Sequence, residues 1–63
     1  MKYNQAVDFA FYRDSLIQRD LWDADRFVSF KLDEHGIKRL VFPNGKVYIP
    51  TSDDIVADDW NVK

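Results

Sequence analysis

The chain has to hold a fold together with 63 residues and no cysteine. A domain of this size buries only about 60% of the surface that its unfolded chain exposes, so it is marginally stable as a monomer. Without cysteine it has neither a disulfide framework nor a thiolate zinc site, and His35 is its one histidine. Association is the remaining way to stabilise so small a domain, and we therefore expect a homo-oligomer, either a dimer or a tetramer.

Aromatic side chains are unusually plentiful for this length, with two Trp, three Tyr and five Phe. Each can bury roughly 150 to 250 Å², so together they exceed what one small core needs. Some of them are therefore expected in a subunit interface or a ligand pocket. They are Tyr3, Phe9, Phe11, Tyr12, Trp22, Phe27, Phe30, Phe42, Tyr48 and Trp60.

The first residues, 1–5, carry one positive charge and no apolar run follows them. They predict neither a signal peptide nor a membrane anchor, and we expect a cytoplasmic protein. The net charge is −2, and residues 51–63 hold four aspartates against one lysine. This balance does not provide the basic surface that binding to nucleic acid requires.

No repeat, low-complexity tract or linker interrupts the chain, so residues 1–63 are predicted to form one domain. A helix is expected to begin at Asn4, which can cap it. Phe9 lies off the apolar stripe of this helix and is a candidate contact with another subunit. The stripe itself consists of Ala6, Val7, Ala10 and Phe11.

Four short apolar or alternating segments are predicted to be strands, separated by turn residues. Gly36 and Gly45 lie in the two segments that read as hairpin turns. The last three strands are therefore expected to form an antiparallel meander. The predicted strands are residues 16–19, 26–32, 37–42 and 46–49.

Pro50 ends the last of these strands, and Thr51 is well placed to cap a short helix. Asp54, three residues later, completes a capping-box-like arrangement. Residues 55–57 are expected to supply the apolar side of this helix, and residues 60–62 a final strand. The predicted fold is α+β, with an N-terminal helix packed on a small antiparallel β-sheet, a short C-terminal helical turn and a final strand.

Residues 50–62, Pro-Thr-Ser-Asp-Asp-Ile-Val-Ala-Asp-Asp-Trp-Asn-Val, resemble the end of the small phage and prophage domains named after the type-two Thoeris anti-defence protein. That ending has a proline, a Ser or Thr, an acidic residue four after the proline, two aliphatic residues, alanine, an acidic pair and tryptophan. Residues 19–22, Arg-Asp-Leu-Trp, are similar to the family's Arg-x-x-Trp after its first strand. Residues 23–25, Asp-Ala-Asp, stand where members usually carry a glycine.

The resemblance implies a homo-oligomeric sponge that binds a cyclic nucleotide-type immune signal in the host cell cytoplasm without cleaving it and without a cofactor. Such a site needs aromatic faces for a base and arginine or backbone donors for phosphate. The candidate ligand-binding residues are Arg19, Trp22, Arg26 and Tyr48. The residues expected to build and close the fold are Thr51, Asp54, Asp59 and Trp60.

Several of these residues have a structural explanation as well. Trp22 and Trp60 are also explained as anchors of a core or an interface, because they are large apolar residues in a small domain. Arg19 can pair with Asp58 or Asp59 across adjacent strands, which would keep its guanidinium away from phosphate.

The C-terminal aspartates also raise the possibility of a metal site, but neither the spacing nor the glycine of an EF-hand is present, so no metal is expected. No nucleophile with a base is visible, and we do not expect an enzyme. Two alternatives to a sponge stay open. One is an acidic inhibitor that binds a host defence protein directly, and the other is a structural or regulatory phage protein of the same fold.

Overall fold

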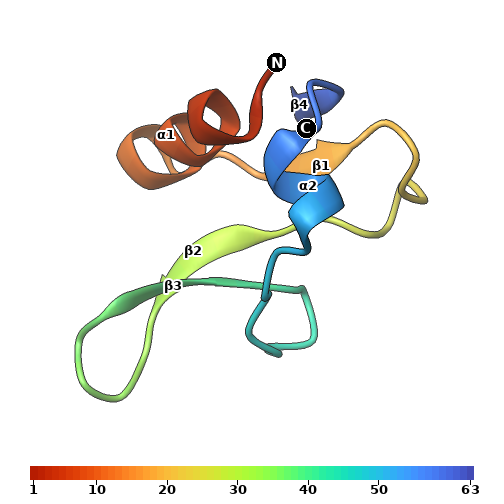
Figure 1. The fold of residues 1–63 in the computed structure, drawn as a ribbon. Coiled ribbons are helices and arrows are strands. Elements are labelled where there is room, and N and C mark those ends of the chain that lie inside the picture. The colour runs from red at the N-terminus through yellow and green to blue at the C-terminus, as the bar shows by residue number, and fades with distance from the viewer.

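The computed structural model describes all 63 residues and contains two helices and four short strands (Figure 1). The strands form two antiparallel pairs, β1 with β4 and β2 with β3. This confirms the predicted α+β fold, with the N-terminal helix packed on antiparallel strands. None of the helices is long and apolar enough to cross a membrane. The elements are α1 (Tyr3–Arg13), β1 (Ile17–Arg19), β2 (Ser29–Leu32), β3 (Lys38–Val41), α2 (Ser52–Val56) and β4 (Trp60–Val62).

Helix α1 begins earlier than its sequence signal indicated. The backbone N–H of Lys2 donates a hydrogen bond of 3.0 Å to Oε1 of Gln5, which closes the first turn. The prediction that Asn4 caps the helix is wrong, because Asn4 lies inside this turn. At the other end Asp14 adopts a left-handed conformation with φ 52°, and the helix stops there.

The predicted apolar stripe of α1 is buried at its small residues. Ala6 and Ala10 have no exposed surface, which lets the helix approach the core closely, and Val7 lies at the edge of the core. Phe11 is partly exposed, and its ring meets the ring of Phe30 edge-on at 5.2 Å between centroids. The stripe therefore continues from the core onto the β2–β3 hairpin.

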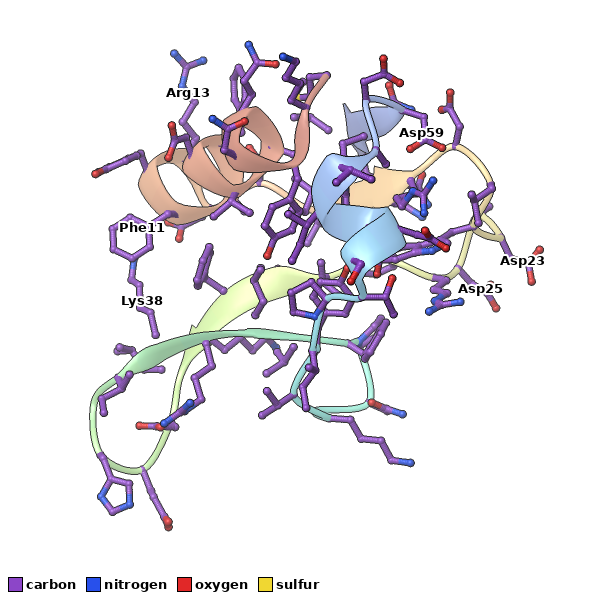
Figure 2. All side chains as sticks on the ribbon, viewed as in Figure 1. Phe11, Arg13, Asp23, Asp25, Lys38 and Asp59 are labelled. Carbon is purple, nitrogen blue, oxygen red and sulfur yellow. The ribbon has the colours of Figure 1, made fainter.

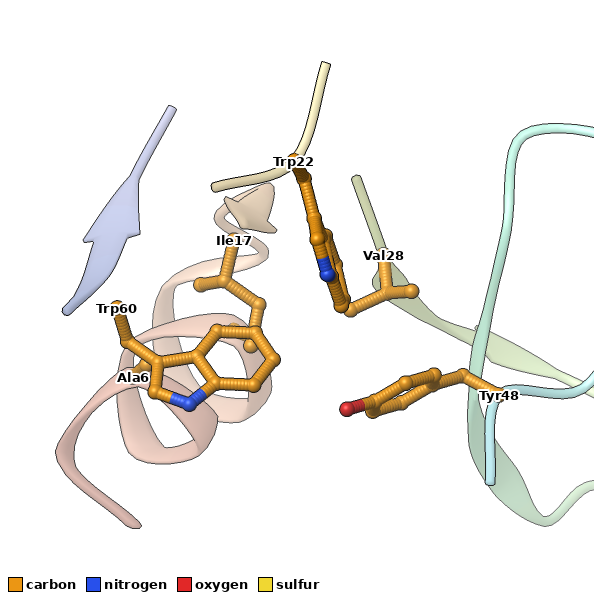
Figure 3. Packing of buried hydrophobic residues seen from close by; sticks show 7 residues of the cluster. Ala6, Ile17, Trp22, Val28, Tyr48 and Trp60 are labelled. Atoms are coloured by element: carbon orange, nitrogen blue, oxygen red, sulfur yellow. The ribbon is translucent and has the colours of Figure 1, made fainter. Parts of the chain in front are cut away.

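The core is built around Trp60, which is fully buried together with Ile17 and Val28 (Figure 3). The ring of Trp22 meets that of Trp60 edge-on at 5.2 Å, and Tyr48 meets Trp22 at 5.7 Å. Edge-to-face pairs of this kind contribute about 0.5–1.5 kcal/mol beyond the area they bury. Aromatic residues from three separate parts of the chain therefore share one core.

Strands β1 and β4 hold the two ends of the chain together. Arg19 pairs with Trp60 and Ile17 with Val62, as the sequence predicted for a final strand. The backbone N–H of Trp60 also donates to the carbonyl of Met1 at 3.0 Å. The first residue therefore lies beside the last strand.

The predicted meander is wrong in its third strand. Val47 forms one isolated bridge with Val41, and the N–H of Tyr48 donates to the carbonyl of Leu40 at 2.8 Å, but no strand forms over residues 46–49. The segment between the turn and Pro50 is short, and proline has no N–H to extend the pairing.

The strand predicted over residues 26–32 is shortened at its beginning. Val28 pairs with Ile17 rather than with β3, so β2 begins at Ser29. Burial is lost along the strand, and Leu32 is exposed although it alternates in phase with Val28. The reason is that the far end of the hairpin extends beyond the core, as Figure 1 shows.

Helix α2 has the predicted start but not the predicted buried side. Thr51 Oγ1 accepts a hydrogen bond of 3.2 Å from the N–H of Asp54, as the capping box predicted. Ile55 and Val56, expected on the buried side, are 52% and 79% exposed. The prediction for these two residues is wrong, because Asp54 faces the core in their place and is itself buried.

Candidate ligand site

Arg19 is held by two carboxylates. Its Nε lies 2.8 Å from Oδ1 of Asp59, and its Nη1 lies 3.0 Å from Oδ1 of Asp54. The planar fork of arginine suits this arrangement, and the hydrogen bond to Asp59 raises the pKa of Arg19 while lowering the pKa of Asp59. The structural explanation for Arg19 therefore applies. Of the two partners considered, Asp58 and Asp59, Arg19 pairs with Asp59, and Asp54 is an additional partner.

Asp54 is the centre of this network. Its Oδ2 accepts a hydrogen bond of 2.6 Å from the hydroxyl of Tyr48, and its carbonyl accepts one of 2.8 Å from Nε1 of Trp60. Burial by itself raises the pKa of Asp54, but hydrogen bonds from Tyr48 and Arg19 outweigh it and lower the pKa. Burial and the hydrogen bond to Asp54 raise the pKa of Tyr48. The network brings together the residues predicted to build the fold, which are Thr51, Asp54, Asp59 and Trp60.

Two of the predicted ligand residues lie in the core. Trp22 is 8% exposed and Tyr48 is 6% exposed, and both have edge contacts with Trp60. In one copy of the chain these rings pack against one another and offer little surface to a ligand. Trp22, Tyr48 and Arg19 therefore stabilise the fold beneath the candidate site and contribute little to its exposed surface.

Arg26 is the predicted ligand residue that reaches the surface. Its guanidinium carbon lies 4.5 Å from the ring centroid of Trp22 and 5.6 Å from that of Phe42. Such stacking keeps the guanidinium flat against the rings while its edge stays in water. Arg26 therefore presents hydrogen-bond donors above an aromatic base.

The loop between β1 and β2 places Arg26. The side chain of Gln18 donates to the carbonyl of Arg26 at 3.0 Å and to that of Asp23 at 3.4 Å. The N–H of Arg26 donates to the carbonyl of Asp23 at 2.9 Å. These contacts fold the loop back toward β1, so Arg26 lies over Trp22.

Arg26 borders a shallow depression of about 470 Å³ at the foot of the hairpin. Lys46 adds a second positive charge, Asp25 adds one negative charge, and Figure 2 shows Asp25 on the loop at this end of the molecule. Phe42 was expected only as one of ten aromatic residues shared among core, interface and pocket, and nothing in the sequence pointed to Lys46. The backbone N–H of Phe42 donates to the carbonyl of Lys46 at 2.9 Å across the turn. The depression is lined by Asp25, Arg26, Phe42, Pro43, Asn44 and Lys46.

This arrangement is suited to holding an anion with a planar group. Two cations lie beside an aromatic surface, and such a combination binds phosphate by charge and a base by stacking. No three acidic, histidine or cysteine side chains come together as a site for a metal ion. No protein-family model, curated protein sequence or solved structure matches this chain.

Proposed function

We propose that the protein is a phage anti-defence sponge, which binds a cyclic nucleotide-type immune signal and sequesters it without cleaving it. The observation that carries the proposal is the guanidinium of Arg26, stacked 4.5 Å from the ring centroid of Trp22 at the edge of the depression that Lys46 also lines. Arg26 and Lys46 would hold phosphate oxygens, and the exposed part of Phe42 would contact a base.

The resemblance of residues 50–62 and 19–22 to the type-two Thoeris anti-defence domains supports this proposal. In our proposal the matched residues stabilise the fold, because Asp54 and Asp59 hold Arg19 at 3.0 and 2.8 Å. Contact with the ligand then depends mainly on Arg26, while Arg19, Trp22 and Tyr48 hold the surface in place. The protein would act in the host cell cytoplasm.

The depression covers a ligand from one side only, whereas small-molecule sites commonly bury 70–90% or more of a ligand. We therefore propose that the protein is a homo-oligomer, a dimer or a tetramer, in which a second copy encloses the signal. The acidic-inhibitor hypothesis has less support, because two of the four C-terminal aspartates, Asp54 and Asp59, are turned inward to pair with Arg19. Only Asp53 and Asp58 face solvent.

Calorimetric titration with cyclic dinucleotides, cyclic trinucleotides and cyclic ADP-ribose isomers tests the proposal. Thermal melting in the presence of the same ligands is the second measurement. At a free ligand concentration 1,000 times Kd the folded state gains about 4 kcal/mol by mass action, so the melting temperature should rise clearly. Mass spectrometry of ligand released by heating should recover the signal intact. Absence of binding across these ligands, or recovery of a cleaved product, would overturn the proposal.

Variants locate the site. Arg26→Gln and Lys46→Gln each remove one cation from the depression, and each should weaken binding at least about tenfold, since charge-assisted hydrogen bonds contribute about 1.5–3 kcal/mol. Lys31→Gln is the matched control, because Lys31 is an exposed cation on β2 outside the depression. Equal affinity of Arg26→Gln and the unmodified protein would show that the ligand binds elsewhere.

A further inference from the structure

The outward face of α1 carries a second depression, of about 370 Å³, on the side of the helix away from the core. Tyr12 is 78% exposed there, and the guanidinium carbon of Arg13 lies 4.9 Å from the ring centroid of Phe9. Figure 2 shows Arg13 pointing away from the hairpin while Phe11 points toward Lys38. The depression is lined by Gln5, Asp8, Phe9, Tyr12 and Arg13.

These side chains follow the spacing of a coiled-coil seam. Gln5, Phe9 and Tyr12 are four and three residues apart, so they lie along one line on the helix surface. In a heptad abcdefg, Phe9 takes position a, and Gln5 and Tyr12 take position d. Asp8 then falls at g and Arg13 at e, which are the positions that flank such a seam with charges.

We propose that a second copy of this chain docks on this face, with the two α1 helices parallel and related by a two-fold axis that runs along them. Asp8 would then face the partner's Arg13, five residues further along, and the same pair would form again by symmetry. Phe9 would pack against the partner's Phe9, and Tyr12 against the partner's Tyr12.

The charges of this face select both the partner and its orientation. The two flanks of the seam have opposite signs, so the face is complementary to itself when the helices run parallel. In an antiparallel pair the g flank faces the partner's g flank and the e flank faces the partner's e flank, so Asp8 could not reach the partner's Arg13 and neither attractive pair would form. A second copy in the parallel orientation is therefore the occupant whose charges match.

The interface is small. A stable complex buries about 800 Å² on each partner, and five side chains from one 11-residue helix cover less than that. The dimer should therefore be weak and form at high micromolar concentration. The residues of this face are not those that line the depression beside Arg26, so the inference does not rest on nucleotide binding.

Sedimentation equilibrium over a concentration series that reaches the millimolar range tests the charge pair. Asp8→Arg should raise the dimer dissociation constant at least about fivefold, because two attractive pairs become repulsive. The double variant Asp8→Arg with Arg13→Asp exchanges the two signs and should restore the dimer. Glu34→Lys, a charge reversal in the exposed hairpin turn, is the control and should change nothing.

Circular dichroism separates lost pairing from lost folding. Arg13→Asp places an acid in the last turn of α1, where it opposes the helix dipole. The helix content of the double variant must therefore be verified before its dimer dissociation constant is compared with that of the unmodified protein. Asp8→Arg lies in the middle of the helix and is the decisive single variant. A chain that stays monomeric at every concentration, or that dimerises equally with Asp8→Arg, would overturn the proposal.

Cysteine cross-linking tests the orientation, and the chain contains no native cysteine to interfere. Position d residues of two parallel helices face each other, so Tyr12→Cys should form a disulfide-linked dimer on mild oxidation. Asn4→Cys is the control, because Asn4 is exposed on the same helix but lies outside the seam. Equal rates of cross-linking for the two variants would contradict a parallel seam.

Discussion

The hydroxyl of Tyr48 donates a hydrogen bond of 2.6 Å to Oδ2 of Asp54 in the interior of the domain. The same carboxylate accepts from Arg19 at 3.0 Å through its other oxygen. A buried carboxylate without such partners is strongly unfavourable, because its charge has left water. The stability of the fold therefore depends on Asp54 staying ionised and keeping both donors.

Replacing Asp54 by Asn should lower the free energy of unfolding by about 2 kcal/mol, because the amide removes the charge that Arg19 and Tyr48 bind. Urea denaturation at neutral pH measures the change. Asp53→Asn is the matched control in the same turn, where Asp53 is exposed, and its cost should stay below about 1 kcal/mol. Equal losses for the two variants would contradict a central role for Asp54.

Replacing Tyr48 by Phe keeps the ring against Trp22 but removes the hydroxyl. We expect the free energy of unfolding to fall by about 1–2 kcal/mol, since a hydrogen bond to a charged acceptor is lost. Tyr12→Phe, at an exposed site, should leave stability unchanged. If Tyr48→Phe is as stable as the unmodified protein, the hydroxyl does not support Asp54 as described.

Replacing Arg19 by Lys tests the geometry of the ion pairs rather than their charge. A lysine ammonium is a point charge and cannot present the fork that reaches Asp54 and Asp59 together. The melting temperature should fall more than it does for Arg39→Lys, whose partner Asp33 lies on the exposed hairpin. A larger fall for Arg39→Lys would contradict this ranking.

Acid should destabilise the protein as the pH falls below about 4. The hydrogen bond from Arg19 lowers the pKa of Asp59 below its ordinary 3.8, and the pKa of Asp54 is lowered as well. The folded state keeps these carboxylates ionised while the unfolded chain takes up protons, so their contribution is present above the unfolded pKa and is lost as the pH falls. Melting temperatures across the acid range measure this loss, and Asp54→Asn should flatten the profile.

Alkaline conditions should destabilise the protein as well, above about pH 10. Burial raises the pKa of Tyr48 and of Tyr3 above the ordinary value of 10.0, and the charge of Asp54 adds to both shifts. The unfolded chain loses these protons first, so the stability present below pH 10 is lost as the pH rises above it. Tyr48→Phe should reduce the slope of this loss, and an unchanged slope would contradict the assignment.

The parts of the fold that the sequence predicted are those whose signals are local. The capping box of Thr51 and Asp54 depends on residues three apart, and it forms as expected. Ala6 and Ala10 of the α1 stripe are buried as their spacing predicted, and Trp60 begins the predicted last strand. In each case the deciding residues lie within one turn or one strand.

The predictions were wrong where the local structure depends on residues far away in the sequence. Ile55 and Val56 have the composition of a buried helix face, but Arg19 and Tyr48 draw Asp54 inward and turn α2 the other way. The pattern of one helix cannot show that a charged residue will be buried, because its partners come from other elements. The missing third strand has a different cause, because the segment between the turn and Pro50 is short and makes one isolated bridge, from Val47 to Val41, before the proline ends the pairing.

The sequence identified single residues of the candidate site but not the neighbours that the fold brings to them. The sequence left Arg19 free to meet either a carboxylate or a phosphate, and the pairing of β1 with β4 brings it to Asp59. Arg26 lies where a ligand can reach it, but its neighbours Phe42 and Lys46 come from the far side of the hairpin. No spacing along the chain predicts that meeting.

The ion pairs of Arg19 span 40 residues to Asp59 and 35 residues to Asp54. During synthesis Arg19 and Trp22 leave the ribosome long before the carboxylates and the indole of Trp60 that complete their surroundings. Contacts of such wide sequence separation are formed late and slow the folding of a small domain. The nascent chain should therefore stay unfolded and open to chaperones and proteases until its last strand is released, and then fold in one step.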